Sequence, residues 1–260
     1  MNRISFENLL LKDPMSLLAD GFPLKNIVPE LAALAPDSAV TVKNLHKDNL
    51  THSVQVVANL PLKSSLRLRW AALYHDVGKA PTRRIEGGHV TFQGHEVVGS
   101  RLTMKRLKAL GYDQSFIDDV SLIVEISGRI SSFSSGAGGW TDAAVRRMAK
   151  DLRDDPSLIN DALDLVAADC TSKHERNRIA ARMRAEGFRQ ALADVRTRDA
   201  QAARRPPLDG IAVMRILGLS PSKDVAIALR WLLENHEHSS PEVAEEALVT
   251  WWPLRGQSHA

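Results

Sequence analysis

Two histidines and two aspartates stand where helical periodicity calls for apolar residues, and their types suit metal chemistry. His75 and Asp76 directly follow the apolar helical pattern of residues 70–74, and His52 lies four residues before Val56 on one face of another expected helix. Burying an imidazole beside a carboxylate costs free energy unless a partner neutralises the charge. A divalent metal ion would neutralise the carboxylate and bind the imidazole.

The second aspartate, Asp169, falls on the core-facing side of a third expected helix. It continues the line of Leu158, Ala162 and Leu165, where another leucine would be ordinary. Each polar residue alone is explained by a core histidine bonded to a carbonyl or by a carboxylate paired with a buried arginine. Together, two imidazoles and two carboxylates from three helices form a ligand set for a transition-metal ion, with room for water.

The elements that must position these residues are expected to be helices almost throughout. The best strand signal, GHVTFQ at 88–93, is too short to found a sheet. Glycine and proline clusters separate the helical segments, and Thr141 is expected to cap the helix that begins after it. The sequence therefore predicts an all-α fold.

Composition indicates an ordinary globular chain. Of the 260 residues, 44% are apolar and 25% are charged. No apolar run approaches the roughly 20 residues that span a bilayer, and the first residues lack a signal-peptide pattern. The single cysteine, Cys170, excludes an internal disulfide and suits a reducing compartment, so we expect a cytoplasmic protein without a membrane partner.

Positive charge is concentrated in residues 173–205, where ten Lys or Arg accompany four Asp or Glu. A solvated helix face explains this charge if a buried apolar stripe lies opposite it. That stripe would comprise Ile179, Met183, Phe188, Leu192 and Val195. A polyanionic partner is the other explanation, and Arg178, Arg182 and Arg189 are then the RNA-binding candidates.

The order His52, His75-Asp76, Asp169 resembles the H…HD…D signature of the HD superfamily of metal-dependent phosphohydrolases. From about residue 27 to residue 252, the chain also resembles the HD domain and C-terminal body of bacterial tRNA nucleotidyltransferases (CCA-adding enzymes), in particular the actinobacterial type. The blocks that carry this likeness are LHKDNLTHSVQVV, AALYHDVGKAPTRR, VTFQGHEVVGSRLTMKRLKAL, WTDAAVRRMAKD, AADCTSK and LDGIAVMRILGLSPSKDVAIAL.

The resemblance implies an all-α HD-domain body with a C-terminal helical extension. We expect a helical lead-in at 1–36, the HD domain at 37–178 and a helical region resembling the tRNA-binding body at 179–260. The strongest linker signal, RRPPLDG at 204–210, falls inside the last segment.

The resemblance also implies one divalent transition metal, held by His52, His75, Asp76 and Asp169. Mixed imidazole and carboxylate ligands suit manganese, iron, cobalt, nickel or zinc alike. The family often carries further histidines where this sequence has Ser127 and Ser131, which argues against a second metal.

In such a site Asp76, Lys79 and His95 are the catalytic candidates, with His95 as general acid or outer ligand. Lys79, Arg83 and Arg84 are the candidates for binding the substrate phosphate, although a solvated loop explains the two arginines equally well.

The expected function is a metal-dependent phosphohydrolase, a phosphomonoesterase or phosphodiesterase acting on nucleotides or phosphorylated RNA ends. No Gly-Ser pair followed by Asp-x-Asp occurs in the chain, so we expect it not to polymerise nucleotides. The alternatives are a non-catalytic module that binds tRNA or other RNA, and one half of a split tRNA nucleotidyltransferase. The sequence leaves the substrate and the oligomeric state open.

Overall fold

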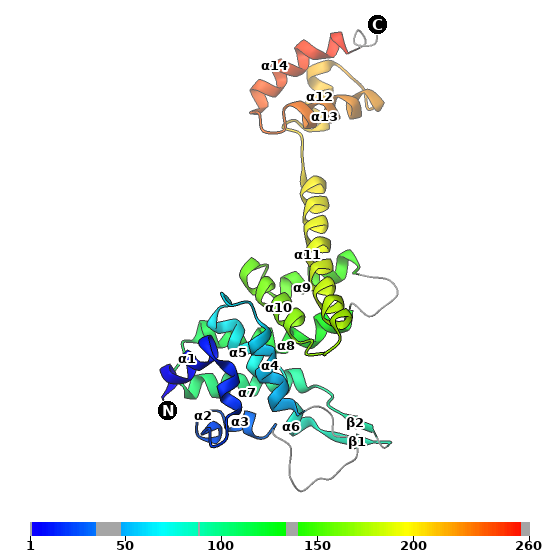
Figure 1. Cartoon of the computed structure of the whole chain (residues 1–260). Helices are drawn as coiled ribbons and strands as arrows, with labels where there is room; N and C mark the ends of the chain where they lie inside the picture. The colour runs from blue at the N-terminus through cyan, green and yellow to red at the C-terminus, as the bar shows by residue number, and fades with distance from the viewer. Residues whose placement is uncertain (1, 35–47, 88, 134–139, 256–260) are drawn as a thin grey trace. The chain divides into compact units, whose positions relative to one another are not determined.

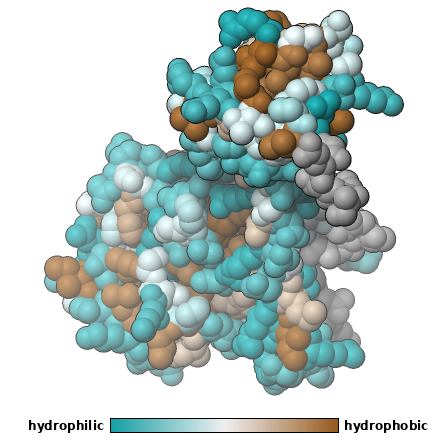
Figure 2. Space-filling view, turned by 90° about the horizontal axis from the view of Figure 1, so that it is seen from above, coloured by the Kyte–Doolittle hydropathy of each residue, from teal (hydrophilic) through white to brown (hydrophobic). Residues whose placement is uncertain are grey.

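The computed structural model describes residues 2–34, 48–87, 89–133 and 140–255, and it confirms the all-α fold. The face seen in Figure 2 is mainly hydrophilic, and its apolar residues gather in separate patches. Among the described helices, none is long and apolar enough to cross a lipid bilayer.

The chain forms two compact units, Met1–Ala193 and Asp194–Ala260 (Figure 1). The elements of the first unit are α1 (Arg3–Lys12), η1 (Pro14–Leu18), α2 (Leu24–Ile27), α3 (Pro29–Ala32), α4 (Asn49–Asn59), α5 (Leu66–Tyr74), α6 (Lys79–Thr82), β1 (Arg84–Glu86), β2 (His89–Thr91), α7 (His95–Ala109), α8 (Gln114–Phe133), α9 (Asp142–Asp151) and α10 (Pro156–Ala168). The long helix α11 (Glu175–Ala203) begins in this unit.

The N-terminal helices pack directly on α5. The ring centroids of Phe6 and Trp70 lie 5.4 Å apart, and Nε1 of Trp70 donates a hydrogen bond of 2.8 Å to the hydroxyl of Tyr112. Arg69 is buried and donates to four backbone carbonyls, including that of Leu10 at 3.0 Å. The helices before residue 35 therefore share one core with α5.

Side-chain caps fix where helices of the first unit begin. Thr141 accepts a hydrogen bond of 3.3 Å from the backbone N–H of Ala144, which confirms the expected cap of α9. Asp48 caps α4 and Asp155 caps α10 in the same way. Each cap satisfies an N–H group of the first helical turn that has no partner within the helix.

Polar contacts hold together the helices that carry the candidate ligands. Arg67 of α5 donates to Asp161 of α10 at 2.7 Å and to Asp119 of α8 at 3.0 Å. Nδ2 of Asn59 donates to the carbonyl of Ala168 at 3.2 Å, which joins the end of α4 to the end of α10. These contacts join the start of α5 to α8 and α10, and the end of α4 to the end of α10.

A β-hairpin joins α6 to α7. β1 pairs antiparallel with β2, with Ile85 opposite Val90, and the hairpin projects beyond the helices beside it (Figure 1). The sequence indicated only the second strand. All three residues of β1 are exposed and two are charged, so β1 has no apolar alternation to reveal it.

The apolar stripe expected on α11 is wrong at two positions. Ile179 is 46% exposed and Met183 is 69% exposed. The buried positions are Ala181, Ala185, Phe188, Leu192 and Val195. Their spacings of four and three keep them on one helical face, and the small residues Ala181 and Ala185 are buried there in place of the larger Ile179 and Met183 that we predicted.

In its described part, the second unit contains the end of α11 and three further α-helices that surround a small apolar core. Its elements are α12 (Gly210–Leu217), α13 (Lys223–Asn235), α14 (Pro241–Trp251) and η2 (Trp252–Leu254). Val213, Leu232 and Leu248 are fully buried in this core. The indole rings of Trp231 and Trp251 stack beside it with centroids 4.3 Å apart.

Candidate metal centre

The turn that follows α5 presents His75 and Asp76. The helix ends at Tyr74, and the backbone N–H of Lys79 donates to the carbonyl of Asp76 at 2.9 Å to close the turn. Gly78 lies so close to α7 that a Cβ atom there would stand 2.0 Å from the carbonyl oxygen of His95. Glycine at this position lets the turn and the start of α7 meet.

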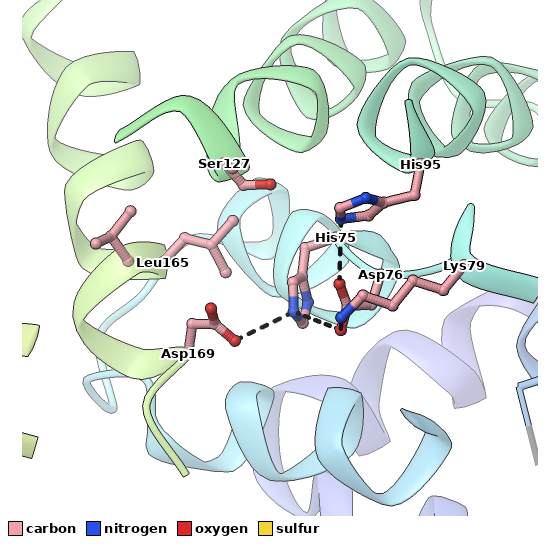
Figure 3. Close-up of a pocket in the computed structure, with 9 residues that line it drawn as sticks. His75, Asp76, Lys79, His95, Ser127, Leu165 and Asp169 are labelled. Atoms are coloured by element: carbon pink, nitrogen blue, oxygen red, sulfur yellow. Dashed lines mark hydrogen bonds and ion pairs between the residues drawn. The ribbon is translucent and has the colours of Figure 1, made fainter. Parts of the chain in front are cut away.

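Four side chains from α4, the α5 turn and the end of α10 lie together. Nε2 of His52 is 2.9 Å from Oδ1 of Asp169 and 3.7 Å from Oδ2 of Asp76. Nε2 of His75 is 3.3 Å from the same oxygen of Asp169 and 3.4 Å from the same oxygen of Asp76. Figure 3 shows the two carboxylates on opposite sides of His75. The structure thus brings together all four candidate ligands.

The outer nitrogen of each imidazole is held by a hydrogen-bond partner. Nδ1 of His75 lies 2.8 Å from the carbonyl of Ala72 and therefore donates to it. Nδ1 of His52 lies 3.1 Å from the hydroxyl of Thr171. Both rings are oriented so that Nε2 faces the carboxylates, which is the arrangement of metal-binding histidines with an outer partner.

The residues present fit a divalent metal ion. Ligand atoms of His52, His75 and Asp76 all lie within 4.8 Å of one another. Nε2 of His75 is buried and has no hydrogen-bond partner among the described residues, despite two carboxylates nearby. A buried nitrogen without a partner is costly, and a metal ion in the cluster would give it one.

Electrostatics keep the carboxylates ionised. Burial opposes the charge of both carboxylates. His75 and Lys79 nevertheless hold the pKa of Asp76 well below its usual range. The hydrogen bond from His52 and the charge of His75 hold the pKa of Asp169 well below its usual range as well. Burial likewise opposes a charged His75, yet the negative charges of Asp76 and Asp169 raise the pKa of His75 well above its usual value. The cluster therefore attracts a positive charge, as a proton or as a metal ion.

A pocket with a volume of about 130 Å³ opens beside the cluster. His75, Asp76 and Asp169 line it together with the apolar side chains of Leu165 and Val166. The side chain of Asp169 is the most open of the four candidate ligands, at 39% exposed. A substrate can therefore reach the cluster from the pocket.

The catalytic candidates Lys79 and His95 also line the pocket (Figure 3). Nζ of Lys79 donates to Oδ2 of Asp76 at 2.7 Å. Nδ1 of His95 lies 2.9 Å from the carbonyl of Phe92, which leaves Nε2 directed toward Asp76 at 3.7 Å. Both side chains thus carry a polar nitrogen at the wall of the pocket.

The serines expected in place of family histidines differ in what the structure describes. Ser127 lines the pocket and donates its hydroxyl to the carbonyl of Val124 at 2.9 Å. The side chain of Ser131 lies outside the described residues.

The predicted cations are divided between paired and exposed positions. Arg83 and Arg84 are exposed at the base of the hairpin and do not line the pocket. Arg178 pairs with Glu175, and Arg189 pairs with Asp164 at 2.6 Å, so both are engaged within the protein. Arg182 is exposed on α11.

Two residues that support the site, Thr171 and Glu96, were not predicted from the sequence. Thr171 lies two residues after Asp169, and this closeness in the sequence was the only indication that it lies near the site. Glu96 lies over Gly128, where a Cβ atom would stand 2.3 Å from Oε1 of Glu96. Its Oε2 lies 3.3 Å from Nδ1 of His95. A contact made possible by a missing side chain leaves no periodic pattern in a sequence.

Comparisons with known proteins agree with this geometry. Residues 49–182 match the family described as HD domain. The chain is 31% identical over 220 residues to the A-adding tRNA nucleotidyltransferase of Deinococcus radiodurans, covering 79% of this chain and 47% of that protein. It is 29% identical over 248 residues to the CC-adding tRNA nucleotidyltransferase of Thermus thermophilus, covering 90% of this chain and 53% of that protein. The chain thus spans about half the length of these relatives.

Proposed function

The chain belongs to the HD domain family, and on that premise we propose that it is a metal-dependent phosphohydrolase acting on nucleotides or phosphorylated RNA ends. The observation that carries the proposal is the buried Nε2 of His75, which faces two ionised carboxylates without a hydrogen-bond partner among the described residues. A scaffold has no need for such a costly group, whereas a metal site uses it.

In this proposal His52, His75, Asp76 and Asp169 hold one divalent ion. When bound, the ion lowers the pKa of a water molecule and polarises a phosphoryl oxygen. Lys79 turns from Asp76 to a phosphate oxygen, because its ammonium group is already at the wall of the pocket. His95 donates a proton from Nε2 to the leaving oxygen, while the Phe92 carbonyl holds its Nδ1. Leu165 and Val166 exclude bulk water from one side.

The experiment that tests the proposal measures metal and hydrolysis on the same samples. Purified protein is analysed by mass spectrometry for transition metals and assayed with nucleoside 2′,3′-cyclic phosphates, nucleoside monophosphates and 3′-phosphorylated RNA. We expect His75→Ala and Asp76→Ala to lose both the metal and the activity while their circular dichroism stays helical.

Matched controls are His89→Ala and Asp20→Ala, which change the same residue types at exposed positions. Full metal and activity in the His75 or Asp76 variants would refute the site. So would an unmodified protein that hydrolyses no substrate of the panel when loaded with each of the five candidate metals.

The names of the relatives support a second candidate, in which the chain serves tRNA nucleotide addition as an RNA-binding part of a larger assembly. The chain alone should then add no CMP or AMP to tRNA lacking its 3′ end, because it has no Gly-Ser pair followed by Asp-x-Asp. Incorporation that requires a second polypeptide would favour this candidate over the hydrolase. Incorporation by the chain alone would contradict both.

A further inference from the structure

The outer face of α7 carries a stripe of cations that no acidic group neutralises. Arg101, Lys105 and Lys108 are four and three residues apart, so they share one face of the helix, and all three are exposed. Across the described parts of the chain, none of their side chains has an ion-pair or hydrogen-bond partner. By contrast, Arg106 on the same helix faces inward and pairs with Glu30 at 2.7 Å. We call Arg101, Lys105 and Lys108 the α7 stripe.

The acidic groups near α7 are turned to other partners. Glu96 is the one acidic residue of α7, and its carboxylate lies against Gly128 on the pocket side. Glu125 of α8 accepts a hydrogen bond from Ser100 at 3.3 Å. The positive charge of the α7 stripe therefore faces solvent without a counter-charge from these two groups.

We propose that the α7 stripe binds the phosphates of single-stranded RNA whose phosphorylated end enters the pocket. The proposal rests on the hydrolase function proposed above and names its substrate as a polynucleotide end, not a free nucleotide. The three cations span about 10 Å along the helix axis, since the rise is about 1.5 Å per residue. Three stacked nucleotides of one strand cover a similar length at about 3.4 Å each.

The position of the α7 stripe relative to the pocket supports this substrate. α7 begins at His95, whose side chain lines the pocket, and the stripe starts six residues later on the same helix. The exposed side chains of Val97 and Met104 add apolar surface beside the cations. Alternating apolar and cationic contacts suit a strand whose bases and sugars are open to the protein.

The pocket itself is too small to recognise a whole nucleotide. Its volume of about 130 Å³ lies below the roughly 300–1,000 Å³ of pockets that enclose a small-molecule ligand. No Phe, Tyr or Trp is among the described residues that line it, so a base finds no stacking partner there. The pocket fits a terminal phosphate with part of its sugar. The binding energy for the rest of the substrate must come from protein surface outside the pocket.

The α11 arginines are weaker candidates for the same task. Arg178 and Arg189 are half-buried and already paired with Glu175 and Asp164. The free energy lost by breaking those ion pairs would offset part of the free energy gained from a phosphate contact. The α7 stripe has no such pairs to break among the described residues.

The binding test uses the full chain and a fluorescent 12-nucleotide single-stranded RNA with a 3′-phosphate, titrated at several KCl concentrations. The variant Arg101→Gln/Lys105→Gln/Lys108→Gln removes the stripe charge. Three lost phosphate contacts at about 0.7 each should flatten the slope of log K against log salt by about 2. We expect the affinity at low salt to fall at least about tenfold, by the same electrostatic loss.

The matched control is Lys12→Gln/Lys25→Gln/Lys63→Gln, which removes three exposed cations from α1, α2 and the turn between α4 and α5. It should bind within twofold of the unmodified protein. A charge-keeping variant, Arg101→Lys/Lys105→Arg/Lys108→Arg, should restore binding. Equal binding by the stripe variant and the control would overturn the inference, as would a loss caused by Arg178→Gln/Arg182→Gln/Arg189→Gln alone.

A kinetic test separates this inference from the proposed function. The stripe variant should lose about tenfold in kcat/KM for 3′-phosphorylated RNA, while kcat/KM for a nucleoside 3′-monophosphate stays within twofold. Equal losses for both substrates would show that the α7 stripe acts through the fold or the pocket, and the inference would be wrong. A chain that hydrolyses neither substrate refutes the hydrolase proposal, and the binding data then decide the α7 stripe separately.

Discussion

Replacing Gly78 by alanine tests the contact that sets the His75–Asp76 turn against α7. The backbone of Gly78 has φ −71° and ψ −12°, which any residue adopts, so the need for glycine is purely steric. The added Cβ would stand 2.0 Å from the carbonyl oxygen of His95, 2.7 Å from the backbone nitrogen of Gly99 and 2.9 Å from the carbonyl carbon of His95. All three are backbone atoms, so no side-chain rotation can make room.

The expected cost follows from this rigidity. Extra atoms in a packed core typically cost about 1–3 kcal/mol, and a clash with fixed backbone belongs at the upper end, about 3 kcal/mol. For a unit of this size each kcal/mol lowers the melting temperature by about 2–4 °C, which gives a fall of about 6–12 °C. The same displacement moves the start of α7 away from the turn, so His95 shifts relative to Asp76 and hydrolysis should fall as well.

Two other glycines provide controls for Gly78→Ala in thermal and urea unfolding. Gly128→Ala meets only the carboxylate end of Glu96, at 2.3 Å, which can rotate away, so we expect a loss below about 1 kcal/mol. Gly187→Ala meets no atom within 4 Å inside α11 and should raise stability by up to about 1 kcal/mol. The reasoning fails if Gly78→Ala unfolds at the temperature of the unmodified protein, or if all three variants shift alike.

Four further predictions concern the site and the core that supports it. Thr171→Val removes the partner of His52 Nδ1 and should weaken metal affinity by about 10–100-fold, measured by metal titration; unchanged affinity would show that this bond does not orient the ring. Arg69→Met removes the donor of four backbone carbonyls, of which the contact with Leu10 is buried and the other three are part-buried, and should cost about 3 kcal/mol in urea unfolding. A loss below about 1 kcal/mol would mean that water replaces the guanidinium. In metal-free protein the pKa of Asp169 is lowered, so its ionised carboxylate stabilises the fold above the ordinary pKa of 3.8, and this stabilisation is lost as pH falls through the lowered value. The difference in free energy of unfolding between the unmodified protein and Asp169→Asn should therefore be full above about pH 5 and should shrink below pH 3.8. The raised pKa of His75 acts in the opposite direction, so the charged imidazole stabilises the fold below pH 6.5, and this stabilisation is lost as pH rises through the raised value. A difference in free energy of unfolding between the unmodified protein and His75→Gln that stays constant across the neutral and alkaline range would contradict this.

The candidate ligands could be predicted because each breaks a strong local pattern. His52 and Asp169 stand on otherwise apolar faces, and periodicity alone indicates that both point inward. The fold class was equally accessible, since helical spacing and the cap at Thr141 are local signals. These features depend only on residues within a few turns of one another.

The parts that could not be predicted depend on contacts between distant segments. The exposure of Met183 follows from which neighbour α11 packs on, and two faces of that helix carry apolar residues. The partner of His52 at Thr171 is 119 residues away in sequence. The charged strand β1 forms because β2 pairs with it, and nothing in its own three residues requires a strand.

The shared core of the N-terminal helices and α5 has a consequence for how the chain emerges during synthesis. Phe6 and Leu10 are fully buried, yet Trp70, which packs on Phe6, and Tyr112, which packs on Trp70, are made much later. At about 5–20 residues per second, roughly 100 further residues take about 5–20 s to appear. A ten-residue helix is marginal on its own in water, so α1 spends that interval unfolded with its apolar side chains open to solvent. A nascent chain of this protein therefore offers a binding segment to ribosome-associated chaperones until α7 and the turn after it have left the exit tunnel.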